Sequence, residues 1–303
     1  MTSAGEYRSG VAVWAAVTSR AKATAKETGV DSAALMRRFV FGRFLARVFH
    51  DPAAPWVLKG GTAILARVHD ARTTKDVDLL GQLSNLDAAV DALRTSTALD
   101  LSDHFRFVVT KVDRTLGGEN QPGVNGCRVN IDAYCGTAQK GSFGVDLVTG
   151  SLMTGAPELL TDPVLDLRGI NAPTMRLYSV VDHIADKLCA TQSTYGAAGD
   201  QPSSRVRDLV DLVVLASAQD IDGSALIAAI RGEWMHRGLP GVPVFAPPQS
   251  WERLYTPLAK KVPACAHATS FEAAVAHIGA FLGPVLDGDA TSRLWSAGDH
   301  VWQ

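Results

Sequence analysis

The chain has 303 residues, and its 29 Lys and Arg against 31 Asp and Glu give a formal net charge of −2. This balance excludes a globally basic nucleic-acid-binding protein, so any contact with nucleic acid must depend on local clusters of cations. No apolar run approaches the roughly 20 residues that span a bilayer, and the four cysteines form no CxxC pair. We therefore expect a cytoplasmic protein with free thiols, no membrane contact, and length enough for two domains.

Two amphipathic helices are expected first, over residues 5–28 and from Asp31 or Ser32 to Val48. In the second, apolar residues recur with a period of 3.6. Its polar side carries four basic residues, namely Arg37, Arg38, Arg43 and Arg47. Such a face is usually solvated surface, but it is also the densest candidate for contact with nucleic-acid phosphates.

The next stretch combines a glycine turn with paired carboxylates. The apolar run Trp56–Leu58 ends in Lys59-Gly60-Gly61-Thr62, and a second apolar run carries Asp76 and Asp78. Residues two apart in a strand share a face, so both carboxylates point the same way, where a hard divalent cation would relieve their repulsion. A Gly pair lets backbone N–H groups approach an anion at a helix start. Against the alternative of solvated carboxylates at a strand end, the stretch predicts a site for phosphoryl or nucleotidyl transfer.

Helix and strand patterns alternate after this motif, which is typical of an α/β sheet. A helix capped by Ser84 is expected, followed by strands over 105–109, 128–134 and 143–148. The sequence turns helical near residue 175, and we expect the domain boundary there.

The helical part carries a second set of charged residues. Lys187 lies on the polar side of a helix that begins at Ser179. The helix over 205–218 is apolar almost all round, yet it contains Asp208 and Asp211. Buried carboxylates need partners, which could be nearby arginines or Lys187. Two more helices are expected, over 249–261 and 270–282.

Four stretches together resemble the AbiEii/MenT family of toxin nucleotidyltransferases, within the DNA polymerase β-like nucleotidyltransferase superfamily. They are Lys59–Arg67, Arg72–Leu80, Asp182–Ala190 and Arg205–Leu215. The resemblance implies an α/β (α+β) fold with a nucleotidyltransferase-type mixed sheet in residues 1–175 and a mainly helical C-terminal domain in residues 176–303.

The resemblance also implies roles for individual residues. The superfamily normally has a third carboxylate, for which Asp132 and Asp146 are both candidates and Asp146 is preferred. The expected catalytic residues are Asp76, Asp78, Lys187 and Asp211. The expected metal ligands are Asp76, Asp78 and Asp146. The expected nucleotide-binding residues are Lys59, Gly60, Gly61, Thr62 and Asp208.

The function implied by the resemblance is that of the toxin in a toxin–antitoxin system. With two Mg²⁺ ions, it would add nucleotides from a nucleoside triphosphate to the 3′ end of tRNA, block aminoacylation and arrest growth. A cognate antitoxin would be its partner. The alternatives are a nucleotidyltransferase for small molecules of the aminoglycoside kind and a non-catalytic module that binds RNA or nucleotides.

Overall fold

The structure is a computed structural model that describes residues 7–114, 124–195 and 201–303. The described helices are α1 (Gly10–Thr28), α2 (Ser32–Val48), α3 (Gly60–Arg67), α4 (Leu86–Thr97), α5 (Val180–Gln192), α6 (Val206–Ala218), α7 (Gly223–His236), α8 (Glu252–Ala259) and α9 (Phe271–Asp287), with short 3₁₀ turns at Gln249–Trp251 and Pro263–Cys265. The described strands are β1 (Trp56–Lys59), β2 (Asp76–Gly81), β3 (Phe105–Asp113), β4 (Asn125–Cys135), β5 (Ala138–Thr149), β6 (Glu158–Thr161), β7 (Thr174–Leu177), β8 (Ile221–Asp222), β9 (Leu294–Ser296) and β10 (Val301–Trp302). None of these helices is long and apolar enough to cross a bilayer.

A mixed sheet organises the N-terminal part, as the sequence predicted. Among the described residues it has seven strands in the order β3-β4-β5-β2-β1-β7-β6. Strand β2 runs parallel to β5 and antiparallel to β1, and β1 runs parallel to β7. The strand that carries the paired aspartates therefore lies in the middle of the sheet, next to the strand that carries Asp146.

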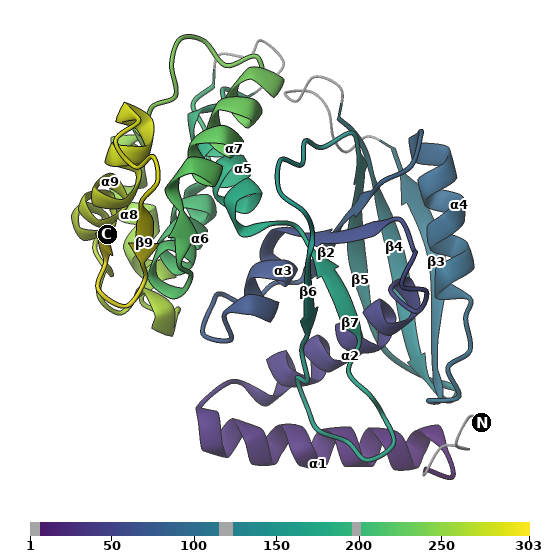
Figure 1. Cartoon of the computed structure of the whole chain (residues 1–303). Helices are drawn as coiled ribbons and strands as arrows, with labels where there is room; N and C mark the ends of the chain where they lie inside the picture. The colour runs from purple at the N-terminus through teal and green to yellow at the C-terminus, as the bar shows by residue number, and fades with distance from the viewer. Residues whose placement is uncertain (1–6, 115–123, 196–200) are drawn as a thin grey trace.

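The two faces of this sheet differ in polarity because side chains alternate along each strand. Val77 and Leu79 of β2 pack with apolar residues of β4 and β5 and of the helices α1, α2 and α4 in one buried cluster. Figure 1 shows these helices on one side of the sheet and the helical C-terminal part on the other. The opposite face of β2 carries Asp76 and Asp78, so the carboxylates lie on the side that faces the C-terminal helices.

Capping side chains fix the helix starts. Ser9 accepts from Ala12 N at the start of α1, which begins later than the predicted residue 5. Asp31 accepts from Ala34 N and caps α2. The predicted Ser84 cap is wrong by one residue, because the Asn85 side chain accepts from Ala88 N.

The C-terminal part is a helical layer around α6, whose residues Leu209 and Leu212–Leu215 are fully buried. The apolar sides of α5, α7, α8 and α9 pack on it in a second cluster. Strand β7 ends at Leu177 and α5 begins at Val180, close to the predicted change near residue 175. The division into two domains, 1–175 and 176–303, stays a prediction.

Helix α3 contributes to both clusters. Ile64 and Leu65 pack with the helical layer, as does Val68, which directly follows the helix. Ala63 and Ala66 pack with the sheet. The helix that follows the glycine turn therefore joins the two parts of the molecule.

Some elements were not predicted. Helix α7 and the β9–β10 hairpin were not expected from the sequence. The helix expected over 249–261 is a 3₁₀ turn followed by α8, and the one expected over 270–282 continues to Asp287.

The expectation of a basic surface on α2 is wrong for two of its four arginines. Arg43 is 6% exposed and Arg47 is 1% exposed. Both bind the Asp103 carboxylate, with a shortest distance of 2.7 Å from Arg47 Nη2 to Asp103 Oδ1. They neutralise a buried acid instead of facing solvent. Arg38 is also engaged, with Asp162 at 2.9 Å, so only Arg37 of the four is exposed.

Candidate active site

Three carboxylates share the open face of the sheet. Asp78 of β2 is paired in register with Asp146 of the parallel strand β5, and Asp76 lies two residues earlier in β2. Asp132 pairs with Ser142, four residues from Asp146, which is about 13 Å along the strand. Its carboxylate accepts a hydrogen bond of 2.6 Å from the Ser142 hydroxyl. The geometry therefore brings Asp146, and not Asp132, to the aspartate pair.

A side-chain cation bridges two of these carboxylates. Arg128 of β4 is paired in register with Asp146, and its guanidinium lies 3.1 Å from Asp146 Oδ1 while also binding Asp76. The guanidinium crosses over Gly144, where a Cβ would lie 2.4 Å from Arg128 Nε. Gly144 thus leaves the room that Arg128 needs to reach Asp76.

The carboxylates differ from ordinary surface acids in their proton affinity. Burial raises the pKa of Asp78 to about 6, and its neighbours Asp146 and Asp76 add to the rise, while Lys187 acts in the opposite sense. Burial also raises the pKa of Asp146, although Arg128 opposes this. These raised pKa values arise because acidic groups are held close together with little water around them. Such an arrangement favours the binding of an additional cation.

The glycine turn touches the aspartates directly. Gly60 has a φ of 56°, and a Cβ there would lie 2.1 Å from Asp78 Oδ2, so both the backbone and the space require glycine. Gly61 lies in the first turn of α3, beside the guanidinium of Arg72. The Thr62 hydroxyl donates to the Asp76 carbonyl at 2.8 Å. The Thr62 hydroxyl therefore holds the start of β2 and cannot donate the same proton to a phosphate. The backbone N–H groups of the turn remain as donors for a phosphate.

Lys59 lies on the same face as Asp78, its register partner in the antiparallel pair. Its ammonium lies 4.4 Å from the Tyr178 ring centroid and donates to Ser151 Oγ at 3.1 Å. These contacts place the charge at the wall of the site.

Lys187 is buried in an ion-pair network with the two aspartates of α6. It is 4% exposed, and its Nζ lies 2.7 Å from Asp208 Oδ1 and 3.0 Å from Asp211 Oδ2. Although burial alone would lower it, these carboxylates hold the pKa of Lys187 above its ordinary value. Arg205 also binds Asp208. The sequence prediction that Lys187 and the aspartates belong together is therefore supported by direct contacts.

The last member of the network comes from the sheet part. Arg72 binds Asp211 through two hydrogen bonds, and Asp211 is fully buried. Asp211 lies behind Lys187 and Arg72 and not on the wall of the cavity. It therefore orients two cations that do reach the cavity.

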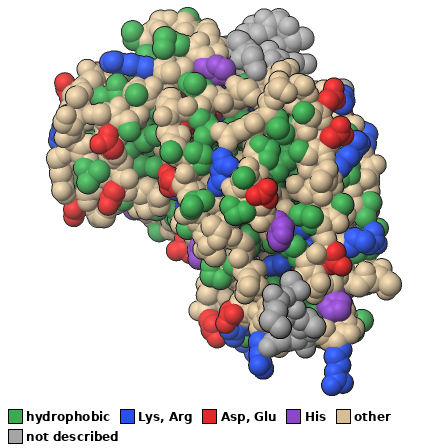
Figure 2. Space-filling model, turned by 45° about the vertical axis from the view of Figure 1, so that its right-hand side comes forward, with side chains coloured by type: hydrophobic (Ala, Val, Ile, Leu, Met, Phe, Trp, Pro, Cys, Tyr) green, Lys and Arg blue, Asp and Glu red, His purple; other side chains and the backbone are tan. Residues whose placement is uncertain are grey.

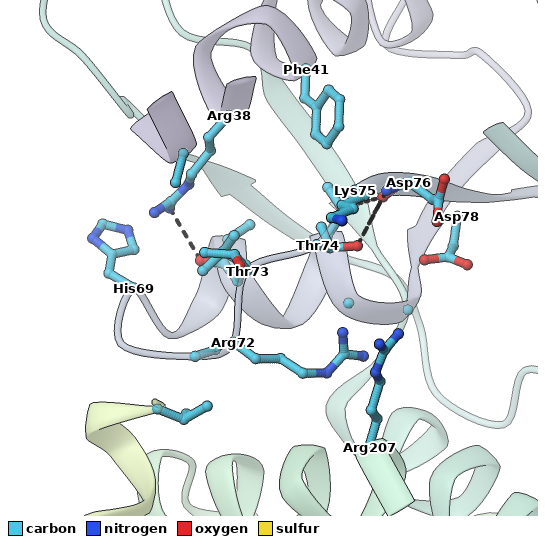
Figure 3. Close-up of a pocket in the computed structure, with 18 of the residues that line it drawn as sticks. Arg38, Phe41, His69, Arg72, Thr73, Thr74, Lys75, Asp76, Asp78 and Arg207 are labelled. Atoms are coloured by element: carbon cyan, nitrogen blue, oxygen red, sulfur yellow. Dashed lines mark hydrogen bonds between the residues drawn. The ribbon is translucent and has the colours of Figure 1, made fainter. Parts of the chain in front are cut away.

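A cavity of about 1140 Å³ joins these groups. Its wall includes the three carboxylates, the turn Lys59–Thr62 and Arg72 from the sheet part, with Lys187 and Arg207 from the helical part. Figure 3 shows the Arg207 side chain extending from the helical layer toward α3, while Asp76 and Asp78 lie together at the start of β2. A space of this size takes a nucleotide-sized ligand.

Three residues of this cavity region were missed in the sequence. Arg128 of β4 lies opposite Asp146, and Gly144 of β5 lies opposite Asp76, so only the strand register shows that they belong to this site. Asp186 precedes Lys187, lines the cavity and binds Arg237 at 2.7 Å. Asp186 could have been predicted from the sequence, because a second charged residue beside Lys187 on a largely apolar helix needs a partner.

The strand order, the carboxylate set and the glycine turn define a nucleotidyltransferase-type sheet. Residues 43–277 match the family model described as nucleotidyl transferase AbiEii toxin, type IV TA system. The chain therefore belongs to this family of nucleotidyltransferase toxins, which confirms the resemblance seen in the sequence. Membership implies a nucleoside triphosphate as donor and a cognate antitoxin as partner.

Solved structures with a similar fold include MenT4, a nucleotidyltransferase toxin from Mycobacterium tuberculosis H37Rv. It is 18% identical, with a TM-score of 0.47, over 71% of this chain and 68% of that chain. JHP933 from Helicobacter pylori is 17% identical, with a TM-score of 0.39, over 68% of this chain and 80% of that chain. A search of curated protein sequences gave no match.

Proposed function

We propose that this chain transfers a nucleotidyl group from a nucleoside triphosphate to the 3′ end of tRNA, with two Mg²⁺ ions, and so blocks aminoacylation. The observation that carries the proposal is the convergence of Asp76, Asp78 and Asp146 in a cavity whose wall also includes Lys187 and Arg207. Carboxylates and cations on the wall of one cavity suit the transfer of a phosphoryl-linked group.

The donor set fits a hard divalent cation. Asp76, Asp78 and Asp146 offer only carboxylate oxygens, which Mg²⁺ prefers, and an Arg128 cation already bridges two of them. Bound to these aspartates, Mg²⁺ would clamp the attacking and leaving oxygens and neutralise charge on the phosphates.

Other residues of the chain would bind the phosphates of the nucleotide. The N–H groups of Gly60 and Gly61, at the start of α3, would bind phosphate oxygens. Lys187, kept charged by Asp208 and Asp211, would neutralise charge on the triphosphate. Arg207 is exposed and, among the described residues, has no ion-pair partner, so it is available to the same phosphates.

The acceptor strand needs further cations, and the cavity rim supplies them. Arg37, Lys75 and Lys261 line the cavity, are exposed, and have no ion-pair partner among the described residues. On the face drawn in Figure 2, basic and acidic side chains are interspersed without a broad basic surface. These three rim cations, combined with a net charge of −2, favour recognition of an RNA end over binding along an RNA duplex.

The direct test is to incubate the protein with total tRNA, Mg²⁺ and each labelled triphosphate in turn. We expect label in tRNA, lost when the 3′ hydroxyl is oxidised, and a rate lowered about a hundredfold by Lys187→Ala. Label on an aminoglycoside-type alcohol but not on tRNA would favour the small-molecule alternative. Triphosphate binding without any transfer would favour the non-catalytic alternative.

The cellular expectation follows from the same proposal. Expression should arrest growth without conferring drug resistance, and co-expression of the antitoxin should restore growth. Because tRNA and triphosphates are the substrates, the proposed place of action is the cytoplasm.

A further inference from the structure

Three of the eight histidines meet at the C-terminal end of α6, away from the cavity. His267 precedes α9, His277 lies within α9, and His300 lies in the turn between β9 and β10. One nitrogen from each imidazole can be chosen so that all three lie within 4.8 Å of one another. The ring centroids are 4.6, 4.7 and 4.9 Å apart. Three potential ligands from separate elements are thus brought to one point.

A hydroxyl group already lies between two of the rings. Ser217 Oγ lies 3.1 Å from His267 Nε2 and 3.2 Å from His277 Nε2, and it donates to the Val213 carbonyl at 2.7 Å. Nitrogen ligands of a tetrahedral zinc ion lie about 2.0 Å from the metal, and therefore about 3.3 Å from each other. The cluster needs only small side-chain rotations to reach that spacing.

The protein holds the third ring in a constrained position. His300 has a φ of 56°, a conformation that few residues other than glycine adopt. Its ring lies nearly parallel to that of Trp295, with an interplanar angle of 7°. Trp295 in turn donates to the Ala216 carbonyl at 2.7 Å, one residue before Ser217. The hairpin is therefore tied to the same end of α6 that carries the hydroxyl.

The surroundings of the three rings suit a ligand role. No described carboxylate forms an ion pair with His267, His277 or His300. Neutral imidazole is the form that binds a metal.

We propose that His267, His277 and His300 bind a divalent late transition-metal ion, Zn²⁺ foremost, with water or the Ser217 hydroxyl in the fourth position. Imidazole ligands select such ions, whereas the carboxylates of the cavity select Mg²⁺. The ion would fasten the C-terminal hairpin to α9 and to the end of α6. This site is independent of the proposed tRNA chemistry.

The test uses the full chain, freed of metal with a chelator and kept in excess Mg²⁺ so that the cavity carboxylates are occupied. Titration calorimetry with Zn²⁺ should give one equivalent bound with a Kd below about 1 µM. Co²⁺ should give the absorption spectrum of a tetrahedral nitrogen-ligated ion. Saturating Zn²⁺ should raise the melting temperature by about 5 °C.

Variants locate the metal. His267→Gln, His277→Gln and His300→Gln should each weaken Zn²⁺ binding at least about tenfold, while His50→Gln, an exposed histidine outside the cluster, should not. His267 is exposed, so its variant keeps the test valid should the more buried His277→Gln chain fail to fold. A Kd above about 1 µM would mean adventitious metal only. Unchanged Zn²⁺ affinity in the His267 and His300 variants would place the ion elsewhere and overturn the proposal.

Discussion

The guanidinium of Arg72 forms two hydrogen bonds, of 2.7 and 2.8 Å, with the carboxylate of Asp211. Arg72 belongs to the segment between α3 and β2, and Asp211 belongs to α6, so this pair connects the catalytic sheet to the helical layer. The same carboxylate lies 3.0 Å from Lys187. Asp211 therefore fixes two cations of the cavity without reaching it.

Asp211→Asn should lower both stability and activity. The change leaves Arg72 and Lys187 with less countercharge in a buried place, which costs about 3 kcal/mol of unfolding free energy. Urea unfolding measures this loss, and triphosphate titration should show weaker binding. The matched control is Asp166→Asn, whose 3.7 Å pair with Arg20 is exposed and should contribute less than about 1 kcal/mol. Equal effects of the two changes would contradict the role given to Asp211.

The carboxylates provide a second prediction. Asp76→Ala and Asp78→Ala should reduce nucleotidyl transfer to background without lowering the melting temperature, because they remove mutual repulsion in the absence of metal. Asp146→Asn should behave in the same way, whereas Asp132→Asn should keep activity near that of the wild type. The rate of nucleotidyl transfer by each variant is measured at several Mg²⁺ concentrations. Near-normal activity of any of the first three variants would remove that residue from the metal site.

Arg128 gives a third prediction, concerning metal dependence. Arg128→Gln removes the cation that bridges Asp76 and Asp146, so carboxylate repulsion should lower the melting temperature in chelator. Mg²⁺ should then stabilise the variant more than it stabilises the wild type. Thermal unfolding with and without Mg²⁺ compares the two shifts, and equal shifts would show that Arg128 does not offset the repulsion.

The cavity rim gives the fourth prediction. Arg37→Glu with Lys75→Glu should weaken tRNA binding and make its salt dependence shallower by about one unit of slope for each phosphate that the variant no longer neutralises. Triphosphate affinity should change little. Arg253→Glu, an exposed arginine outside the cavity lining, serves as the control. If tRNA affinity and slope stay unchanged in the rim variant, the acceptor reaches the cavity by another side.

Asp103 gives the fifth prediction, on pH. Although burial opposes it, Arg47 and Arg43 hold the pKa of Asp103 below its ordinary value. A carboxylate whose pKa is lower in the folded chain than in the unfolded chain stabilises the fold. This stabilisation is complete above the pKa of the unfolded chain, about 3.9, and is lost as the pH falls through the pKa of the folded chain. Asp103→Asn should therefore cost about 3 kcal/mol at pH 7 and less near pH 3. Urea unfolding at both values checks the sign, and a constant loss would contradict it.

Local patterns were enough to predict the strand that carries the proposed metal ligands. A period of two places Asp76 and Asp78 on one face, and that result needs no knowledge of distant residues. The choice between Asp132 and Asp146 needed the strand register, which the two alternating patterns leave open. The residue preferred from the sequence, Asp146, is the one that lies beside Asp78 in the structure.

Long-range partners explain where prediction from the sequence failed. Arg43 and Arg47 have the spacing of a solvated helix stripe, and the acid that pairs with them, Asp103, lies more than 50 residues later. The histidine cluster was missed for the same reason, since His267, His277 and His300 match no local metal motif. The spacing of residues along one helix says which side chains share a face, but not what covers that face.

The double membership of α3 limits how the molecule can move. In hinged enzymes two lobes move apart as rigid bodies about a few residues that absorb the change in backbone angles. Here Ile64 and Leu65 are anchored in one lobe while Ala63 and Ala66 are anchored in the other, and the four residues are consecutive. Moving the two parts of the molecule apart would break the apolar packing on one side of α3. We therefore expect the width of the cavity to stay the same when substrates bind, and we expect substrates to enter it from the rim.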